Sequence, residues 1–248
     1  MKFCIKAASY VGCIRERNED MMLVGQQFVR DDDYAEIDDL NAKSRLIVAL
    51  ADGMGGHKGG EVASSDVLHN LAYYYGDMPT GLSVQGFMEA IQEWLKSINN
   101  IIDSKGRSEP CYYNMGTTLV GFAYYEGEFF WMNCGDSRLY QLRKGELRQL
   151  STDHSLNSLT GEAGHSNIIV NCIGGGCKAS YIDIMKCTES VHVGDIFMLC
   201  SDGLSDMVTD HHILEMLMNG ADANALCQAA IINGGIDNVS VCVIKIEE

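Results

Sequence analysis

The spacing of apolar residues divides the chain into strands and helices. Lys2 to Val11 alternates between apolar and polar residues, which is typical of a half-buried β-strand. Other short apolar runs are bounded by glycine, asparagine or charged residues and also predict strands. These runs are Met21–Phe28, Leu46–Ala51, Thr117–Tyr125, Phe129–Cys134, Leu139–Arg143, Leu147–Leu150, Tyr181–Cys187, Ile196–Cys200 and Val239–Ile246.

Apolar residues at three- and four-residue spacing predict helices between these strands. Glu61–Tyr75 has this spacing and is followed by Gly76, a typical stop signal. Ser83–Lys105 has a continuous apolar stripe, with Ser83 available as the N-cap and Gly106 as the end. Two shorter helices are predicted near Asp210–Asn219 and Asp222–Asn233.

The connections between the elements indicate the fold class. Short glycine-containing links join successive strands and favour antiparallel hairpins, and the helices occur in pairs. The sequence therefore predicts an α+β fold, and without repeats or linkers the whole chain, residues 1–248, is expected to be a single domain. Residues 151–176 are polar and glycine-rich and predict an irregular surface segment, and the acidic run Asp31–Asp39 predicts a solvated loop.

Composition narrows the range of partners and of compartments. The formal net charge of −16 argues against nucleic acid or an anionic membrane as a partner. No apolar run is long enough to span a bilayer. The 10 cysteines are scattered and form no C-x-x-C pair, which favours reduced, buried thiols in a cytoplasmic protein.

Acidic residues occur repeatedly where predicted strands begin or end. Asp52 ends an apolar strand and is followed by a glycine-rich stretch that would let the backbone approach a ligand closely. Comparable positions at other strand ends are occupied by Glu19, Asp20, Asp136, Asp202 and Asp237. Any one of these acids could be a turn or cap residue, but together they predict a cluster whose repulsion a divalent cation would offset. Because the set offers only oxygen ligands, Mg²⁺ or Mn²⁺ suits it better than Zn²⁺.

The chain resembles the metal-dependent serine/threonine protein phosphatases of the type 2C family, particularly the bacterial members. The resemblance rests on motifs that occur in the family's order over nearly the whole chain: R-E-R-N-E-D (Arg15–Asp20), A-D-G-M-G-G-H-K-G-G-E-V-A-S (Ala51–Ser64), M-G-T-T-L (Met115–Leu119), N-C-G-D-S-R (Asn133–Arg138), L-S-T-D-H-S (Leu150–Ser155), S-D-G-L-S-D (Ser201–Asp206) and D-N-V-S (Asp237–Ser240). It implies a central antiparallel β-sandwich flanked by helix pairs.

The resemblance also implies roles for individual residues. Asp52 matches the aspartate that bridges two metal ions, and the carbonyl of Gly53 matches a ligand of the second ion. Asp202 and Asp237 match the other carboxylates of the first ion.

Further roles follow from the same motifs. Glu19 and Asp20 match acids that bind the second ion or orient its waters, and Asp136 with Asp202 matches a third, weaker site. Arg15 matches the arginine that holds the substrate phosphate.

The implied activity is hydrolysis of phosphoserine and phosphothreonine in proteins by a hydroxide that bridges two metal ions. No cysteine is followed six residues later by arginine, so the loop of the thiol phosphatases is missing. Phosphorylated proteins, and a serine/threonine kinase that makes them, are the expected partners. Two other functions stay open, namely a catalytically silent binding or regulatory module and a two-metal hydrolase of small phosphate esters.

Two features depart from the family pattern. Animal members carry a histidine, proposed as general acid, where this chain has Met54, and methionine cannot donate a proton. Leaving-group protonation would then fall to a metal-bound water, and the nearby His57 is expected to be a structural loop residue. Residues 153–176 are also shorter than the usual flap beside the family's active site, so substrate selection is expected to differ.

Overall fold

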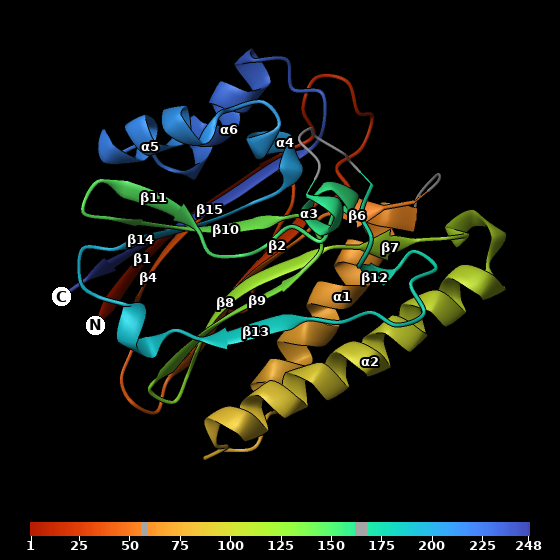
Figure 1. Cartoon of the computed structure of the whole chain (residues 1–248), viewed down its shortest axis with the longest axis horizontal. Helices are drawn as coiled ribbons and strands as arrows, with labels where there is room; N and C mark the ends of the chain where they lie inside the picture. Colours follow the sequence, from red (N-terminus) through yellow and green to blue (C-terminus); the bar gives the residue numbers. More distant parts are fainter. Residues whose placement is uncertain (56–58, 162–167) are drawn as a thin grey trace.

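Two β-sheets packed face to face form the centre of the molecule, and helices cover both outer faces (Figure 1). The structure is a computed structural model that describes residues 1–55, 59–161 and 168–248. Every strand pairing within the two sheets is antiparallel. The predicted α+β class, a sandwich between helix pairs, is confirmed.

Each large sheet contains strands from distant parts of the chain. The first has the order β11-β10-β14-β15-β1-β4, with bounds β1 Lys2–Tyr10, β4 Asp33–Asp39, β10 Arg138–Arg143, β11 Glu146–Gln149, β14 Ile196–Cys200 and β15 Val239–Glu247. The second has the order β13-β9-β8-β5-β2-β3, with bounds β2 Met21–Val24, β3 Gln27–Val29, β5 Arg45–Ala51, β8 Leu119–Tyr125, β9 Glu128–Cys134 and β13 Asp183–Lys186. A small third sheet joins β6 (Gly53–Met54), β7 (Gly116–Thr117) and β12 (Ile173–Gly174).

The continuous apolar run of β5 reflects burial on both faces of its sheet. Ile47 and Ala49 belong to the cluster under the helices, whereas Val48 and Leu50 belong to the cluster between the two sheets. Because successive side chains of a strand point to opposite faces, both sets must be apolar. Burial of both faces fixes the orientation of β5 and with it the position of Asp52, the residue that follows the strand.

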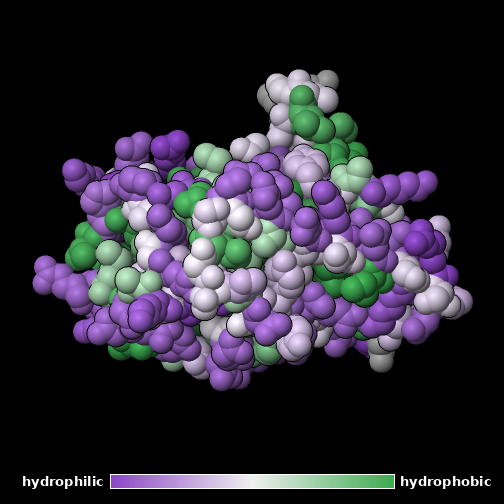
Figure 2. Space-filling view, turned by 90° about the horizontal axis from the view of Figure 1, so that it is seen from below, coloured by the Kyte–Doolittle hydropathy of each residue, from purple (hydrophilic) through white to green (hydrophobic). Residues whose placement is uncertain are grey.

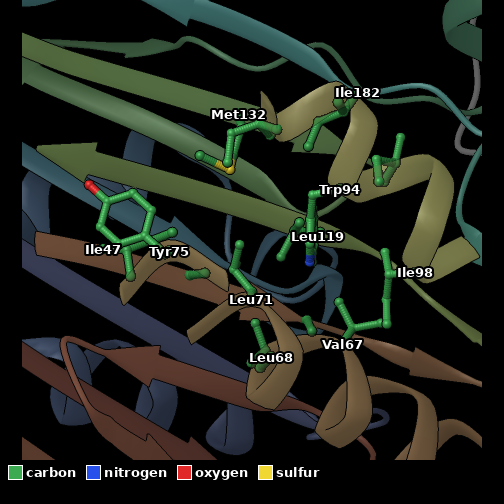
Figure 3. Packing of buried hydrophobic residues seen from close by; sticks show 14 of the residues in the cluster. Ile47, Val67, Leu68, Leu71, Tyr75, Trp94, Ile98, Leu119, Met132 and Ile182 are labelled. Atoms are coloured by element: carbon green, nitrogen blue, oxygen red, sulfur yellow. The ribbon is translucent and has the colours of Figure 1, made fainter. Parts of the chain in front are cut away.

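The long helices α1 (Gly59–Gly76) and α2 (Val84–Ser108) cover the second sheet. Figure 3 shows their apolar side chains packed on strand residues, with Leu71 and Trp94 in the centre. The side of the molecule on which α2 lies is mostly hydrophilic in Figure 2, as the amphipathic stripe requires. Ser83 caps α2 as predicted, since its hydroxyl accepts a hydrogen bond from the Gly86 amide at 3.0 Å.

The predicted end of α2 at Gly106 is wrong. The helix continues to Ser108, and Gly106 is buried within it. A Cβ at this position would lie 3.0 Å from the carbonyl oxygen of Tyr112. The glycine therefore permits close packing against the next turn of chain and does not terminate the helix.

Helices α4 (Asp202–Ser205), α5 (Asp210–Met218) and α6 (Ala223–Ile232) cover the first sheet. Thr209 and Asp222 cap the last two, through hydrogen bonds from the amides of His212 and Ala225. Helix α4 was not predicted, because four residues are too few to display a helical period. In the described part of the chain, no helix combines the length and the apolar character that crossing a membrane requires.

Two strand assignments near the N-terminus differ from the prediction. Residues 33–39 of the expected acidic loop form the edge strand β4, which pairs with β1 along its length. An edge strand needs backbone hydrogen bonds on one side only, so its exposed charges can remain in water. The predicted strand Met21–Phe28 is a hairpin of β2 and β3, because Gly25 adopts a positive φ of 59° and reverses the chain.

The segment predicted to be irregular contains two short elements in its described residues, α3 (Leu156–Thr160) and β12. Residues 162–167 of the segment lie outside the described residues. Strand β12 joins the small sheet and thereby ties the end of this segment to β7.

A buried ion pair on the first sheet gives a testable stability prediction. Asp195 is 2% exposed and accepts hydrogen bonds from Arg143 Nε at 2.7 Å and from the His192 amide at 2.9 Å. Burial alone would raise the pKa of Asp195, but these bonds outweigh it and lower the pKa. Its stabilising effect is therefore complete above the unfolded pKa of about 3.9 and is lost as pH falls through the lower folded value.

We expect Asp195→Asn to lower the free energy of unfolding by about 3 kcal/mol at pH 7, because Arg143 loses its buried partner. Urea denaturation of both proteins between pH 7 and pH 2.5 measures the difference. The difference should shrink below about pH 4 as the wild-type carboxylate is protonated. A constant difference across this range would contradict the ion-pair explanation.

Candidate metal centre

The candidate centre begins at the point where β5 ends. Asp52 follows β5, and its backbone is fixed by Thr118, whose hydroxyl accepts from the Asp52 amide at 3.0 Å and whose amide donates to the Asp52 carbonyl at 2.9 Å. The Thr117 hydroxyl donates to the same carbonyl at 2.8 Å. These bonds fix the backbone of Asp52 and involve neither oxygen of its carboxylate. Figure 1 shows the small sheet that includes β6 and β7 beside the start of α1.

Glycine at positions 53 and 60 is required by close packing around this strand end. A Cβ on Gly53 would lie 2.2 Å from the Gly60 carbonyl oxygen, and one on Gly60 would lie 2.7 Å from the Glu19 carboxylate. The Glu19 carboxylate thus packs directly against the N-terminal turn of α1. The Glu61 amide donates a hydrogen bond to it there, as helix N-termini do for anions.

The loop that carries Arg15, Glu19 and Asp20 is held to the start of β15 by Asn238. The Asn238 side chain donates to the Arg17 carbonyl at 2.9 Å and accepts from the Glu19 amide at 2.8 Å. Asp20 is 1% exposed and accepts a hydrogen bond from the Ser201 hydroxyl at 2.8 Å. The N- and C-terminal strands and the start of α4 therefore share one polar network.

Asp202 and Asp136 approach the centre from the first sheet and from the β9–β10 turn. Asp202 is the first residue of α4 and is separated from β14 by Ser201 alone, while Asp136 lies in the turn after β9. Both residues are half-buried, and each acts electrostatically on Asp52. The acids predicted from strand ends are thus brought to one end of the sandwich.

Arg15 and Asp237 form an ion pair at the edge of the centre. Arg15 Nη2 lies 2.6 Å from Asp237 Oδ2, and the two side chains are 53% and 34% exposed. The hydrogen bond to Asp237, with further attraction from Glu19 and Asp52, raises the pKa of Arg15. The guanidinium is therefore placed beside the acids and remains open to solvent.

Burial and mutual repulsion raise the pKa values of the clustered acids. Burial is the largest cause for each of Asp52, Asp202, Asp136 and Asp20. The pKa of Asp202 rises to about 8, and those of Asp20 and Asp136 rise to about 6. Asp52 is raised well above its usual value, with Asp20, Asp202, Asp136 and Asp237 adding repulsion in that order. A positive ion at the centre would relieve this repulsion.

The residues fit a hard divalent cation in their chemistry. Asp20 Oδ1 is buried and has no hydrogen-bond partner among the described residues, as expected for an oxygen that faces a cation or its water. Among those same residues, no three acidic, histidine or cysteine side chains are placed closely enough to form a finished ligand set. The carboxylates converge on one place, and closing them on an ion would require side-chain movement.

Sequence reasoning left out the polar residues that hold this arrangement together. All four lie within the family motifs, but the motifs alone indicate no role for them: Thr117, Thr118, Ser201 and Asn238. The sequence feature that could identify them is a hydroxyl or amide residue next to the acids at the strand ends. His57 lies outside the described residues, and Met54 is on β6, next to Gly53.

Comparisons with known proteins agree with this arrangement. Residues 24–228 match the family model described as protein phosphatase 2C. The serine/threonine protein phosphatase PstP of Mycobacterium tuberculosis is 32% identical over 96% of this chain, but the chain spans only 44% of the length of PstP. The protein phosphatase PhpP of Streptococcus pneumoniae is 31% identical, with 91% of this chain and 95% of PhpP covered.

Solved structures share the architecture over the full chain. A serine/threonine phosphatase of S. agalactiae superposes with a TM-score of 0.82 at 25% identity and covers 99% of this chain and 100% of its own. The catalytic domain of PstP, solved in complex with 2 manganese ions, superposes with a TM-score of 0.74 at 31% identity and full coverage of both chains. The family model covers most of the sequence, and this chain belongs to the protein phosphatase 2C family.

Proposed function

We propose that this chain hydrolyses phosphoserine and phosphothreonine in proteins with the help of Mn²⁺ or Mg²⁺. The observation that carries the proposal is the convergence of carboxylates on Asp52 with the exposed Arg15 guanidinium beside them. Such a centre combines a cation site with a phosphate site, which is what a metal-assisted phosphoryl hydrolase needs.

The first two ions would be held around Asp52. Its carboxylate would bridge them, with Asp202 and Asp237 on the first ion and the Gly53 carbonyl on the second. The amide and the carbonyl of Asp52 both hydrogen-bond to Thr118, so the backbone of Asp52 is fixed. This supports Asp52 as the bridging ligand, because a fixed backbone limits where the carboxylate can lie.

The remaining acids would complete the centre. Glu19 and Asp20 would bind the second ion or orient its waters, and the unpartnered Asp20 oxygen supports this role. Asp136, with Asp202, would provide a third and weaker site.

Bound ions would supply a water of lowered pKa as the nucleophile and positive charge for the phosphoryl oxygens. Arg15 would leave Asp237 and donate two parallel hydrogen bonds to the substrate phosphate. Met54 has no proton to give, so the leaving oxygen must be protonated from elsewhere.

Phosphorylated proteins are the proposed substrates, and a serine/threonine kinase that modifies the same proteins is a proposed partner. The names of the relatives PstP and PhpP support the substrate class. Residues 1–248 are proposed to act as one catalytic domain, with residues 151–176 as a short flap. The scattered, mostly buried thiols support a cytoplasmic location.

Metal removal tests the proposal directly. We expect a phosphothreonine peptide to be hydrolysed with Mn²⁺ or Mg²⁺, and turnover to fall to background in EDTA and to return when metal is added. Phosphate release measures the rate, and circular dichroism in EDTA checks that the fold persists. Silence under every metal, in a folded and metal-bound protein, would favour the binding-module function. Faster turnover of small phosphomonoesters than of phosphopeptides would favour the small-ester hydrolase.

A further inference from the structure

A second arginine shares the cleft beside Arg15. The cleft has a volume of about 250 Å³ and is lined by Arg15, Glu16, Arg17, Glu19 and Gly55. The Arg17 side chain is 48% exposed, and its guanidinium lies 3.9 Å from the Glu61 carboxylate, which is too far for a hydrogen bond. Among the described residues, Arg17 therefore has one long ion pair, with Glu61, and its guanidinium belongs to the lining of the cleft.

The carboxylate nearest to Arg17 is shared with a better-placed arginine. Arg30 Nη1 lies 3.6 Å from the same Glu61 carboxylate, and the Arg30 side chain is only 19% exposed. Arg30 is also fixed by hydrogen bonds to the Asp20 carbonyl at 2.7 Å and to the Ser64 hydroxyl at 2.8 Å. The two arginines share the Glu61 carboxylate without a hydrogen bond to it, and Arg30 has fixed partners besides, so among the described residues no hydrogen bond holds the Arg17 guanidinium.

The backbone of Arg17 is nevertheless rigid. Its carbonyl accepts the Asn238 side-chain hydrogen bond that ties the loop to β15. Arg17 follows Arg15 by two residues, so their Cα atoms are at most about 7 Å apart. An extended peptide has about the same distance between residues two positions apart.

We infer that Arg17 is a specificity-determining residue that selects substrates with an anionic side chain near the phosphoresidue. This inference rests on the proposed function, in which Arg15 holds the phosphate. The anionic group is a carboxylate or a second phosphate, since both match the guanidinium. The net charge of −16 repels anionic substrates at long range. A preference for anionic peptides would therefore have to come from local attraction by Arg17.

Phosphothreonine peptides that differ at one position test the inference. The residue two positions from the phosphothreonine, on either side in separate peptides, is Ala, Asp, Lys or phosphoserine. We expect kcat/KM of the wild type to be about 3- to 10-fold higher with Asp or phosphoserine than with Ala, mainly through KM. The ratio of Asp to phosphoserine peptides shows which anion is preferred.

Variants then assign the preference to one side chain. Arg17→Ala should reduce the Asp-to-Ala ratio to about 1, and Arg17→Glu should make the Lys peptide the best substrate. Arg148→Ala is the matched control, because it removes the same charge from an exposed position on β11 and should retain the wild-type ratio. Equal kcat/KM for all peptides, or a ratio that survives Arg17→Ala, would overturn the inference.

Failure of the proposed function itself would look different. The wild type would then hydrolyse none of the peptides, with or without metal. Fluorescence anisotropy would still give the Kd of each peptide for the wild type and for Arg17→Ala. A preference for anionic peptides that depends on Arg17 would support the inference, and equal Kd values would overturn it.

Discussion

Replacing Asp52 by asparagine should lower kcat/KM for a phosphothreonine peptide by at least about 10³-fold. The amide keeps the size of the side chain and the hydrogen bonds that Thr118 makes with the backbone, so the strand end should keep its shape. What the substitution removes is the negative charge that would bridge two cations. Asp237→Ala removes another proposed ligand and should also abolish turnover.

Metal titration by calorimetry, together with phosphate release, tests this prediction. Asp52→Asn should bind Mn²⁺ far more weakly than the wild type, with unchanged circular dichroism. Asp77→Asn is the matched control, because Asp77 is exposed beyond the end of α1 and should keep full activity. Retained turnover in Asp52→Asn would refute the proposed metal bridge.

The same substitution should not destabilise the protein in EDTA. Asp52 is surrounded by acids that raise its pKa, so its charge opposes folding when no cation is present. An asparagine carries no such charge, and the thermal midpoint in EDTA should stay the same or rise. Opposite effects on activity and stability distinguish a residue kept for function from one kept for structure.

The sequence predicted most of the fold because its strongest patterns are local. The glycine links after Tyr125 and Arg143 form tight turns, with positive φ at Glu126, Gly127, Lys144 and Gly145, so the hairpins could be expected. Strand β4 could not be expected, because an edge strand rich in acidic residues has the same composition as a solvated loop. Its pairing with β1 is a tertiary contact that no local pattern records.

The candidate site was predictable in composition but not in its interactions. Acids at strand ends indicated which carboxylates would meet, and the structure brings them to one end of the sandwich. The sequence could not show that Asn238 holds the loop of Arg17 and Glu19, since these residues are more than 200 positions apart. It also gave no sign that Glu61 is shared between Arg17 and Arg30.

Arg15→Ala should lower kcat/KM by about 10²- to 10³-fold while sparing metal binding. In the structure Arg15 pairs with Asp237, a proposed metal ligand, so its positive charge competes with a cation for that carboxylate. Removing the arginine leaves Asp237 free, and Mn²⁺ affinity should be unchanged or somewhat higher. The loss of activity must then come from the substrate phosphate, which has lost its guanidinium partner.

Arg15→Lys separates charge from geometry at this position. Lysine keeps the positive charge but cannot form two parallel hydrogen bonds, so it should restore only part of the activity lost in Arg15→Ala. Arg107→Ala, at an exposed site 68% open to solvent on α2, is the control for a change in net charge and should retain full turnover. Calorimetry gives the Mn²⁺ affinity and steady-state kinetics give kcat/KM for each variant, and both are measured on the same preparation. If Arg15→Ala instead weakens Mn²⁺ binding tenfold or more, Arg15 supports the metal centre through Asp237, and its assignment to the phosphate is wrong.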